Sequence, residues 1–251
     1  MKKELTIVFV SYYSKHNIIK YLKQFNDHFK VIIIDNCNDF SLKKNLKKFK
    51  NVSIFFNKKN LGFGASSNIG LKKIKTKYGL HLDLDTKFSN DSIIKLVKQA
   101  NSLKDFIILG PKIKNFNYKP EDFKEKKTLK NLNSMNFIDG CCMLFNMNKF
   151  KKFGYFDENF FIYFEEIDLC RRLRQKNKKI YLDPKIVIKH IGGSSHNESI
   201  NYEMELSRNW HWMWSTFYYN KKHDGFLYAF FKISPKFFSS ILKIIFYTLL
   251  F

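Results

Sequence analysis

The chain is strongly basic, yet it contains almost no arginine. Its formal net charge is +23 at pH 7, and its only arginines are Arg171, Arg172, Arg174 and Arg208. A charge excess of this size is typical of proteins that bind nucleic acid or an acidic membrane. Arginine, however, is the side chain that binds phosphates and guanine edges with two parallel hydrogen bonds. Because the lysines are scattered along the chain, we expect no nucleic-acid partner. We attribute the charge to a drift in composition, and the resulting basic surface would attract acidic lipid headgroups.

Cysteine is scarce as well. The four cysteines are Cys37, Cys141, Cys142 and Cys170, and no two of them have C-x-x-C spacing. The adjacent Cys141 and Cys142 are poor disulfide partners for each other. This pattern predicts reduced thiols in a cytoplasmic protein.

Long hydrophobic runs are missing from the first 225 residues. The apolar run at residues 5–10 is too short for the core of a signal peptide, and Glu4 precedes it. A transmembrane helix needs about 20 apolar residues, which no segment of this part offers. With 251 residues that are 45% hydrophobic, the chain can bury one large domain, with or without a tail.

Short β-rich runs alternate with amphipathic patterns in the first half. We expect strands at residues 5–10, 31–35, 52–56, 79–84 and 106–110, and helices near 15–28, 41–48, 65–75 and 91–102. Alternation of this kind predicts an α/β fold with a mostly parallel sheet flanked by helices. Such sheets bind ligands beyond the carboxyl ends of their strands.

The second half is less regular. A Lys/Asn-rich stretch at residues 112–136 is expected to be a surface loop. Regular structure resumes at 137–145, followed by a helix over 165–176 and short strands at 179–182 and 186–190.

The tail interleaves aromatic residues with lysines from about Trp210 onward, and Pro235 interrupts it. Its final apolar run, residues 237–251, is shorter than the roughly 20 residues that span a bilayer. An amphipathic helical segment at a membrane surface fits this composition. A helix packed on the protein's own core and a dimer contact are the alternatives.

Two acids, Asp83 and Asp85, end the apolar strand expected at 79–84. Residues i and i+2 of a strand share a face, about 6–7 Å apart. The pair is therefore either a turn, in which aspartate is common, or a site for a divalent cation.

The glycine-rich segment NLGFGASSNIG, residues 60–70, follows an expected strand and opens an expected helix. Its glycines either form a turn with a helix cap or let the backbone approach an anionic group. A dinucleotide-binding G-x-G-x-x-G fits badly, because Ser67 takes the place of the third glycine and the motif follows the third strand.

Six segments occur in an order that resembles the family 2 glycosyltransferases, nucleotide-sugar enzymes of the GT-A fold, and above all their bacterial rhamnosyltransferase-like branch. The segments are TIVFVSYYS, VIIIDNCND, NLGFGASSNIG, LDLDT, GYFDENFFIYFEEIDLCRRL and KHIGGSS. The likeness covers roughly residues 4–215. It implies a GT-A domain over 1–209, with a nucleotide-sugar half at 1–110 and an acceptor and catalytic half at 137–209. Residues 210–251 would be a membrane-associating or packing tail.

The resemblance implies an inverting, metal-dependent glycosyltransferase that moves a sugar from a nucleoside diphosphate-sugar to a glycan acceptor. We expect a lipid-linked acceptor, cell-surface polysaccharide or lipopolysaccharide synthesis, and a peripheral location on the cytoplasmic face of the inner membrane. A sugar nucleotidyltransferase and a catalytically inactive scaffold with the same fold are the rival interpretations.

The resemblance also implies roles for residues at the donor. Ser11, Tyr12 and Asp35 would hold the nucleotide base or ribose. The donor-contacting loop would contain Asn60, Gly62, Gly64 and Asn68. For Asp35 alone, a turn or a helix cap is the alternative, because a strand-end carboxylate accepts backbone hydrogen bonds equally well.

The LDLDT segment resembles the metal-binding D-x-D of the family, which implies Mg²⁺ or Mn²⁺ against the donor diphosphate. Asp85 would be the direct ligand, and Asp83 would bind the ribose or act through water. His190 matches the third metal contact, and an imidazole ligand suits Mn²⁺ better than Mg²⁺.

Glu166 matches the position of the general base, the second residue of an acidic pair. The chain departs from the family there, because aspartate is the common residue. One extra methylene moves the carboxylate by about 1.5 Å, and a displacement of that size can cost about 10²-fold in rate. Acids in the first turn of a helix are the plainer alternative for Glu165 and Glu166. Asp168 would be mainly structural, beside Arg171 and Arg172.

Overall fold

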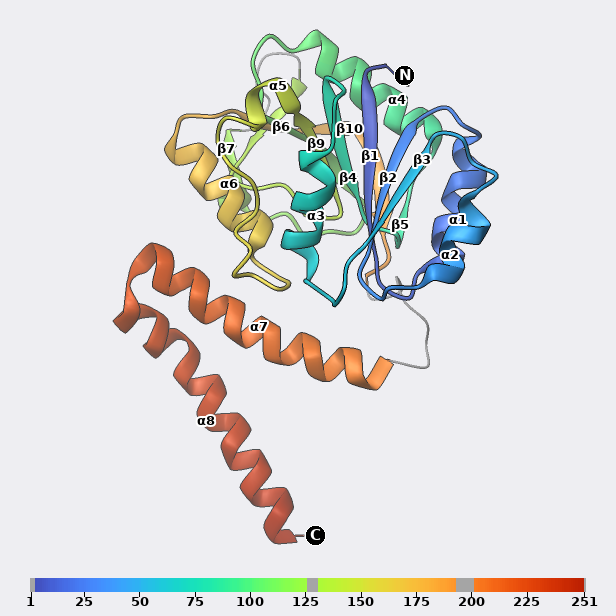
Figure 1. Ribbon diagram of the computed structural model, residues 1–251. Helices are drawn as coiled ribbons and strands as arrows, with labels where there is room; N and C mark the ends of the chain where they lie inside the picture. The colour runs from blue at the N-terminus through green and yellow to red at the C-terminus, as the bar shows by residue number, and fades with distance from the viewer. Residues whose placement is uncertain (1–2, 126–130, 193–200, 251) are drawn as a thin grey trace.

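Parallel strands form one half of the central sheet in the computed structural model, which describes residues 3–125, 131–192 and 201–250 (Figure 1). These strands lie in the order β3-β2-β1-β4 and are β1 (Leu5–Ser11), β2 (Lys30–Asp35), β3 (Val52–Phe56) and β4 (Tyr78–Leu82). Each neighbouring pair is parallel. The expected parallel α/β arrangement is therefore confirmed for this half.

The other half of the sheet is mixed. β9 (Cys142–Asn146) runs antiparallel between β4 and β6 (Ile108–Ile113), and β10 (Ile180–His190) is parallel to β6. The two strands expected at 179–182 and 186–190 are this one strand. Its register against β6 shifts between Asp183 and Val187, around Pro184, which has no N–H to donate to the sheet.

The stretch at 112–136, expected to be a loop, extends the sheet instead. It contains a 3₁₀ turn, η1 (Pro120–Asp122), and the strands β7 (Phe123–Glu125) and β8 (Asn133–Met135). β8 pairs antiparallel with β10, and β7 pairs with β8. β8 joins the sheet through β10, a strand far along the chain, so the local composition did not reveal these strands. Residues 126–130 lie outside the described residues.

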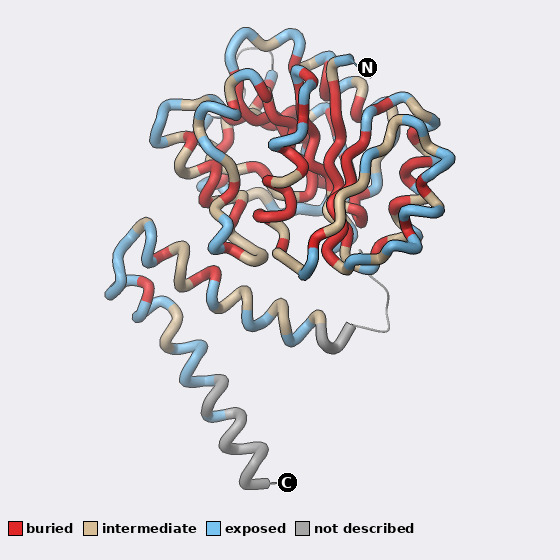
Figure 2. Tube along the Cα trace, in the orientation of Figure 1, coloured by how far each residue is buried: buried red, intermediate tan, exposed pale blue. Residues whose placement is uncertain are grey.

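Helices cover both faces of the sheet. One face packs against α1 (Lys15–Phe25), α2 (Phe40–Leu46) and α4 (Asn90–Ser102); the other packs against α3 (Phe63–Lys72), α5 (Met147–Phe150) and α6 (Glu165–Gln175). Successive strand residues point to opposite faces. Phe9 accordingly belongs to the first core and Val8 to the second, and both are fully buried. Figure 2 shows the buried residues concentrated in the sheet.

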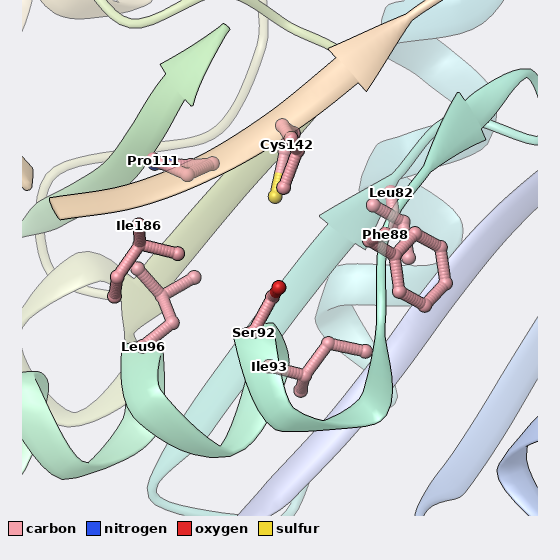
Figure 3. A pocket seen from close by; sticks show the side chains of 9 residues that line it. Leu82, Phe88, Ser92, Ile93, Leu96, Pro111, Cys142 and Ile186 are labelled. Atoms are coloured by element: carbon pink, nitrogen blue, oxygen red, sulfur yellow. The ribbon is translucent and has the colours of Figure 1, made fainter. Parts of the chain in front are cut away.

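A small apolar pocket lies between α4 and the sheet (Figure 3). Leu82, Leu96 and Cys142 are among its lining residues, and the Ser92 hydroxyl is the polar group shown pointing into it. Ligand sites combine apolar walls with several convergent polar groups. We therefore attribute this pocket to imperfect packing of α4.

Two long helices follow the domain. α7 (Asn201–Asp224) passes beneath the carboxyl edge of the parallel strands, and α8 (Phe226–Leu250) leads away from the domain (Figure 1). The expected start of the tail at residue 210 falls inside α7, whose Ser215 and Asn220 are buried. Among the described residues, no helix combines the length and the apolar character that crossing a bilayer requires.

Candidate functional site

The expected nucleotide residues lie at one edge of the sheet. The register of β1 and β2 places Ser11 opposite Asp35, the last residue of each strand. Both side chains are fully buried. Among the described residues, the Ser11 hydroxyl has no hydrogen-bond partner, so it is a free polar group at this edge. Tyr12 follows directly, with its ring edge-on to that of Tyr13 at a centroid distance of 4.8 Å.

Asp35 forms the turn that was the alternative to a ligand contact. Its Oδ2 accepts a hydrogen bond from the Asp39 backbone N–H at 2.9 Å, and its Oδ1 accepts one from the Cys37 thiol at 3.2 Å. Burial raises the pKa of that thiol to about 11. Asp35 therefore shapes the turn after β2, and a contact with the nucleotide remains a prediction.

A buried polar cluster that the sequence analysis missed connects this edge to the glycine-rich loop. The Asn36 side chain donates to the Gly62 carbonyl at 3.2 Å and accepts from Asn57 at 2.8 Å and from the Ser66 hydroxyl at 2.7 Å. Its signal in the sequence is an asparagine directly after each of two neighbouring strands, β2 and β3.

Gly62 is required by a close approach of two backbone segments. It has φ of +81°, and a Cβ there would lie 2.2 Å from the Phe161 carbonyl oxygen. That oxygen accepts from the Phe63 N–H at 2.7 Å, and the Asn60 side chain accepts from the Gly62 N–H at 2.9 Å. Gly64 also faces this segment, with a Cβ position 3.3 Å from the Cβ of Phe156.

The Asn68 side chain forms its hydrogen bonds with other residues of the protein. Its amide nitrogen donates to the Phe156 carbonyl and to Glu158, both at 2.9 Å, and its oxygen accepts from the Phe156 N–H at 3.0 Å. The side chain is almost completely buried. Since both ends of the amide are engaged, Asn68 holds the segment that faces the glycine-rich loop, and a contact with the donor remains a prediction.

Asp83, Asp85 and His190 converge into one cluster. Each offers one ligand atom, and these atoms all lie within 4.8 Å of one another. His190 Nε2 lies 3.2 Å from an Asp85 carboxylate oxygen and 3.8 Å from an Asp83 oxygen. The cause is the pairing of β5 (Thr86–Lys87) with the end of β10, which sets His190 opposite Thr86.

His81 orients one of the two acids and was missed by the sequence analysis. It is completely buried, with Nε2 3.1 Å from Asp83 Oδ1 and Nδ1 3.3 Å from the Ser67 hydroxyl. The Phe63 ring packs edge-on against it at 4.5 Å. Its signal was a histidine two residues before Asp83, on the same face of β4.

The charges within this cluster are strongly coupled. The hydrogen bond to Asp85, opposed by burial and reinforced by the charge of Asp83, raises the pKa of His190 to about 9. Burial raises the pKa of Asp83, although the hydrogen bond from His81 opposes the increase. Protonation of His190 is thereby favoured next to the two acids. A divalent cation would compete with that proton, because a ligating imidazole is neutral.

Glu165 and Glu166 open α6 after an unusual turn. The two preceding residues, Tyr163 and Phe164, have φ of +72° and +69°. Among the described residues, Oε2 of each glutamate is buried without a hydrogen-bond partner. Burial, followed by the charge of Asp139, raises the pKa of Glu166 to about 7, and burial and the charge of Glu166 raise that of Glu165 well above its usual range.

Asp139 joins the two acidic groups into one site. Its carboxylate lies within 4.8 Å of ligand atoms of Cys141 and His190, and its charge acts on Glu166. Burial keeps the pKa of the Cys141 thiol well above its usual value, which makes Cys141 a poor metal ligand. Asp139 therefore lies between the cluster of Asp83, Asp85 and His190 and the glutamate Glu166.

The first part of the chain matches a known family. Residues 6–154, more than half of the chain, match the family model of glycosyl transferase family 2. The chain belongs to this family. The matched region includes Asp83 and Asp85 and ends before Glu166 and His190, which the fold brings to the same site.

Two relatives are named transferases. The low-salt glycan biosynthesis hexosyltransferase Agl10 of Haloferax volcanii is 24% identical over 200 residues, which are 72% of this chain and 64% of Agl10. Rhamnosyltransferase WbbL of Escherichia coli K12 is 25% identical over 246 residues, which are 85% of this chain and 91% of WbbL. The chain thus spans somewhat less than two thirds of the length of Agl10.

The fold is the GT-A fold of the family. The mannosyltransferase PcManGT from Pyrobaculum calidifontis, solved in complex with GDP-Man and Mn²⁺, matches 93% of this chain and 68% of its own with a TM-score of 0.63. The two sequences are 11% identical, so the similarity concerns the fold alone.

The contact between His81 and Asp83 leads to a prediction about metal affinity. We expect His81→Leu to weaken Mn²⁺ binding by about 10- to 100-fold, the usual cost of losing a residue that orients a ligand. The measurement is the Mn²⁺ concentration that gives half-maximal thermal stabilisation in the presence of a nucleoside diphosphate. The exposed His28 provides the control His28→Leu. Equal affinity in both variants would contradict the role of His81.

Proposed function

We propose that this chain is an inverting, metal-dependent glycosyltransferase that moves a sugar from a nucleoside diphosphate-sugar to a glycan acceptor. The observation that supports it is the convergence of Asp83, Asp85 and His190 at the carboxyl edge of the sheet, in a chain of glycosyl transferase family 2. Open α/β sheets bind their ligands at this edge. A structural relative of the same fold was solved with GDP-Man and Mn²⁺.

The residues of the cluster fit a divalent cation. Asp85 and His190 would hold it, and Asp83 would bind it directly, through water, or would bind the donor ribose. Two carboxylates and one imidazole favour Mn²⁺ over Mg²⁺, which prefers oxygen ligands alone. When bound, such a cation acts as a Lewis acid that neutralises charge on the departing diphosphate.

Glu166 would be the general base. Its buried and unpaired Oε2 fits a hydroxyl of the acceptor, and a pKa of about 7 suits a group that takes a proton near neutral pH. The acceptor oxygen would attack the anomeric carbon while the bond from that carbon to the diphosphate breaks. The hydroxyl proton would pass to Glu166, and the configuration at the carbon would invert.

The acceptor would be a lipid-linked glycan at an acidic membrane surface on the cytoplasmic face of the membrane. The support is the tail, whose exposed apolar side chains include Trp210, Trp214, Phe226, Leu227, Tyr228, Phe230, Phe231, Phe237, Phe238 and Leu242. Lys232 and Lys236 lie among them on α8 and are exposed as well. A helix with this composition binds anionic lipid through burial of its apolar side chains and through charge.

Nucleotide binding tests the metal cluster. In calorimetry with UDP, dTDP, GDP and ATP, we expect one diphosphate to bind only with Mn²⁺ or Mg²⁺ and Asp85→Asn to weaken that binding by at least about 10-fold. Asp91→Asn, on the exposed start of α4, is the matched control. No diphosphate binding with either metal would favour an inactive scaffold, and preference for the triphosphate would favour a nucleotidyltransferase.

The pH dependence of transfer tests Glu166. The base is active when deprotonated, so kcat/KM at saturating Mn²⁺ should rise with pH up to about 7 and then level off. Glu166→Gln should lower kcat by about 10²- to 10⁴-fold, whereas the exposed Glu121→Gln should leave it unchanged. Normal turnover in Glu166→Gln would exclude Glu166 as the base.

Vesicle binding tests the tail. We expect the protein to sediment with vesicles that contain phosphatidylglycerol and to stay in solution with pure phosphatidylcholine. The double variant Leu227→Ser/Phe231→Ser should bind at least about 10-fold more weakly, because each side chain would otherwise bury apolar surface worth about 1.5–3 kcal/mol. Phe40→Ser, a change at an exposed phenylalanine of α2, is the control. Equal binding of all three proteins would contradict a membrane role for α8.

A further inference from the structure

We propose that Lys222 on α7 is a positioning residue that holds the segment at residues 157–164, which leads directly into the helix that carries the proposed base Glu166. This inference rests on the proposed role of Glu166. It gives the helical tail a part in catalysis, in addition to any contact with a membrane.

Lys222 connects the two ends of the segment that leads to Glu166. Its Nζ lies 2.6 Å from Asp157 Oδ2, before the turn, and 2.7 Å from Asp168 Oδ1, in the first turn of α6. Glu166 lies between these two anchors in the sequence. The Lys222 ammonium group therefore connects Asp157, at the start of the segment, to α6, the helix that carries Glu166.

The segment needs such support because its backbone is unfavourable. Tyr163 and Phe164 both adopt the left-handed region directly before Glu165. Bulky residues are rare in this conformation and persist where the surroundings determine it. One such neighbour is α7, whose Tyr219 ring lies against the Phe164 ring at a centroid distance of 5.3 Å.

Further contacts from α7 follow the same segment. The Ser215 hydroxyl donates to the Ile162 carbonyl at 2.8 Å, and the Tyr218 hydroxyl donates to Asp157 at 3.0 Å. The His211 ring stacks on Phe161 at a centroid distance of 4.1 Å. Since the Phe161 carbonyl also binds the Phe63 N–H, α7 reaches the glycine-rich loop through this segment.

The two anchors differ in their dependence on Lys222. Asp168 is completely buried, and it also contacts Arg172 Nε at 2.7 Å and His223 Nε2 at 2.8 Å. Asp157 has Lys222 as its cation, alongside hydrogen bonds from Tyr218 and Asn159. Burial by itself would raise the pKa of Asp157, but these contacts, led by Lys222, lower it to about 2. Loss of Lys222 should therefore release the start of the segment and leave Asp168 paired.

The expected consequence is a loss of turnover without a loss of donor binding. Lys222 binds Asp157 and Asp168, away from Ser11 and from the cluster of Asp83, Asp85 and His190. The glycine-rich loop keeps its own contacts with the segment, through the Phe161 carbonyl and through Asn68. Misplacement of a catalytic group by about 1 Å can cost about 10²-fold in rate. We expect Lys222→Met to lower kcat by about 10-fold, with the affinity for a Mn²⁺–nucleoside diphosphate complex unchanged.

The test compares Lys222→Met with Lys221→Met, the exposed neighbour, and with Lys222→Arg. Hydrogen exchange of backbone amides in residues 158–166 is measured beside kcat and nucleotide affinity. Faster exchange confined to this segment and lower kcat in Lys222→Met, with partial recovery in Lys222→Arg, would support the proposal. Asp157→Asn should reproduce the effect, and it serves as the second variant where Lys222→Met does not fold.

Unchanged exchange and unchanged kcat in Lys222→Met would overturn the proposal. So would an equal loss of kcat and nucleotide affinity, which indicates general destabilisation. Absence of transfer activity in the unmodified protein would instead contradict the proposed function. In that case hydrogen exchange alone decides whether Lys222 holds the segment.

Discussion

The pairing of β5 with the end of β10 is the constraint on which the candidate site depends. It is only two residues long, yet it sets His190 opposite Thr86 and brings an imidazole to Asp85 from more than 100 residues away in the sequence. The Ile191 N–H completes the contact by donating to the Asp85 carbonyl at 3.2 Å. Backbone hydrogen bonds of this kind fix strand register, and a slip by one residue would turn His190 to the opposite face.

A second feature is the cluster of acidic side chains in an otherwise basic protein. Beyond the larger effect of burial, the charges of Asp83 and Asp139 raise the pKa of Glu165 and Glu166, in a chain of net charge +23. Like charges that are partly removed from water raise one another's pKa. A cation and a proton are the natural occupants of such a site, which matches a metal-assisted reaction with a carboxylate base.

The segment at residues 157–164 connects the glycine-rich loop, the two glutamates of α6 and the helix α7. It packs on the glycine-rich loop through Phe161, it carries Glu165 and Glu166 into the site, and α7 covers its other side. Glu166, the proposed base, is longer than the aspartate that the resemblance led us to expect, so the placement of its backbone matters for reach. Long side chains position a reacting atom well only when their backbone and neighbours are rigid.

The comparison between sequence and structure separates local from long-range information. Alternating patterns revealed the first four strands and the helices between them, because periodicity reports which face of each element is buried. The composition of 112–136 concealed β7 and β8, because β8 joins the sheet through β10, which begins more than 40 residues later in the chain, and β7 pairs with β8. Likewise, no local pattern revealed that Phe156, 88 residues away, engages the amide of Asn68.

By itself the sequence determined the α/β class, the placement of two acids at the end of a buried strand, and a glycine-rich segment that opens a helix. These features follow from hydrophobic period, strand geometry and the absence of a side chain, all of which are local. Only the tertiary structure decided that His190, His81 and Asp139 surround these acids, and that α7 holds the segment before Glu166. Those contacts join distant residues through strand register and helix packing, which no local pattern encodes.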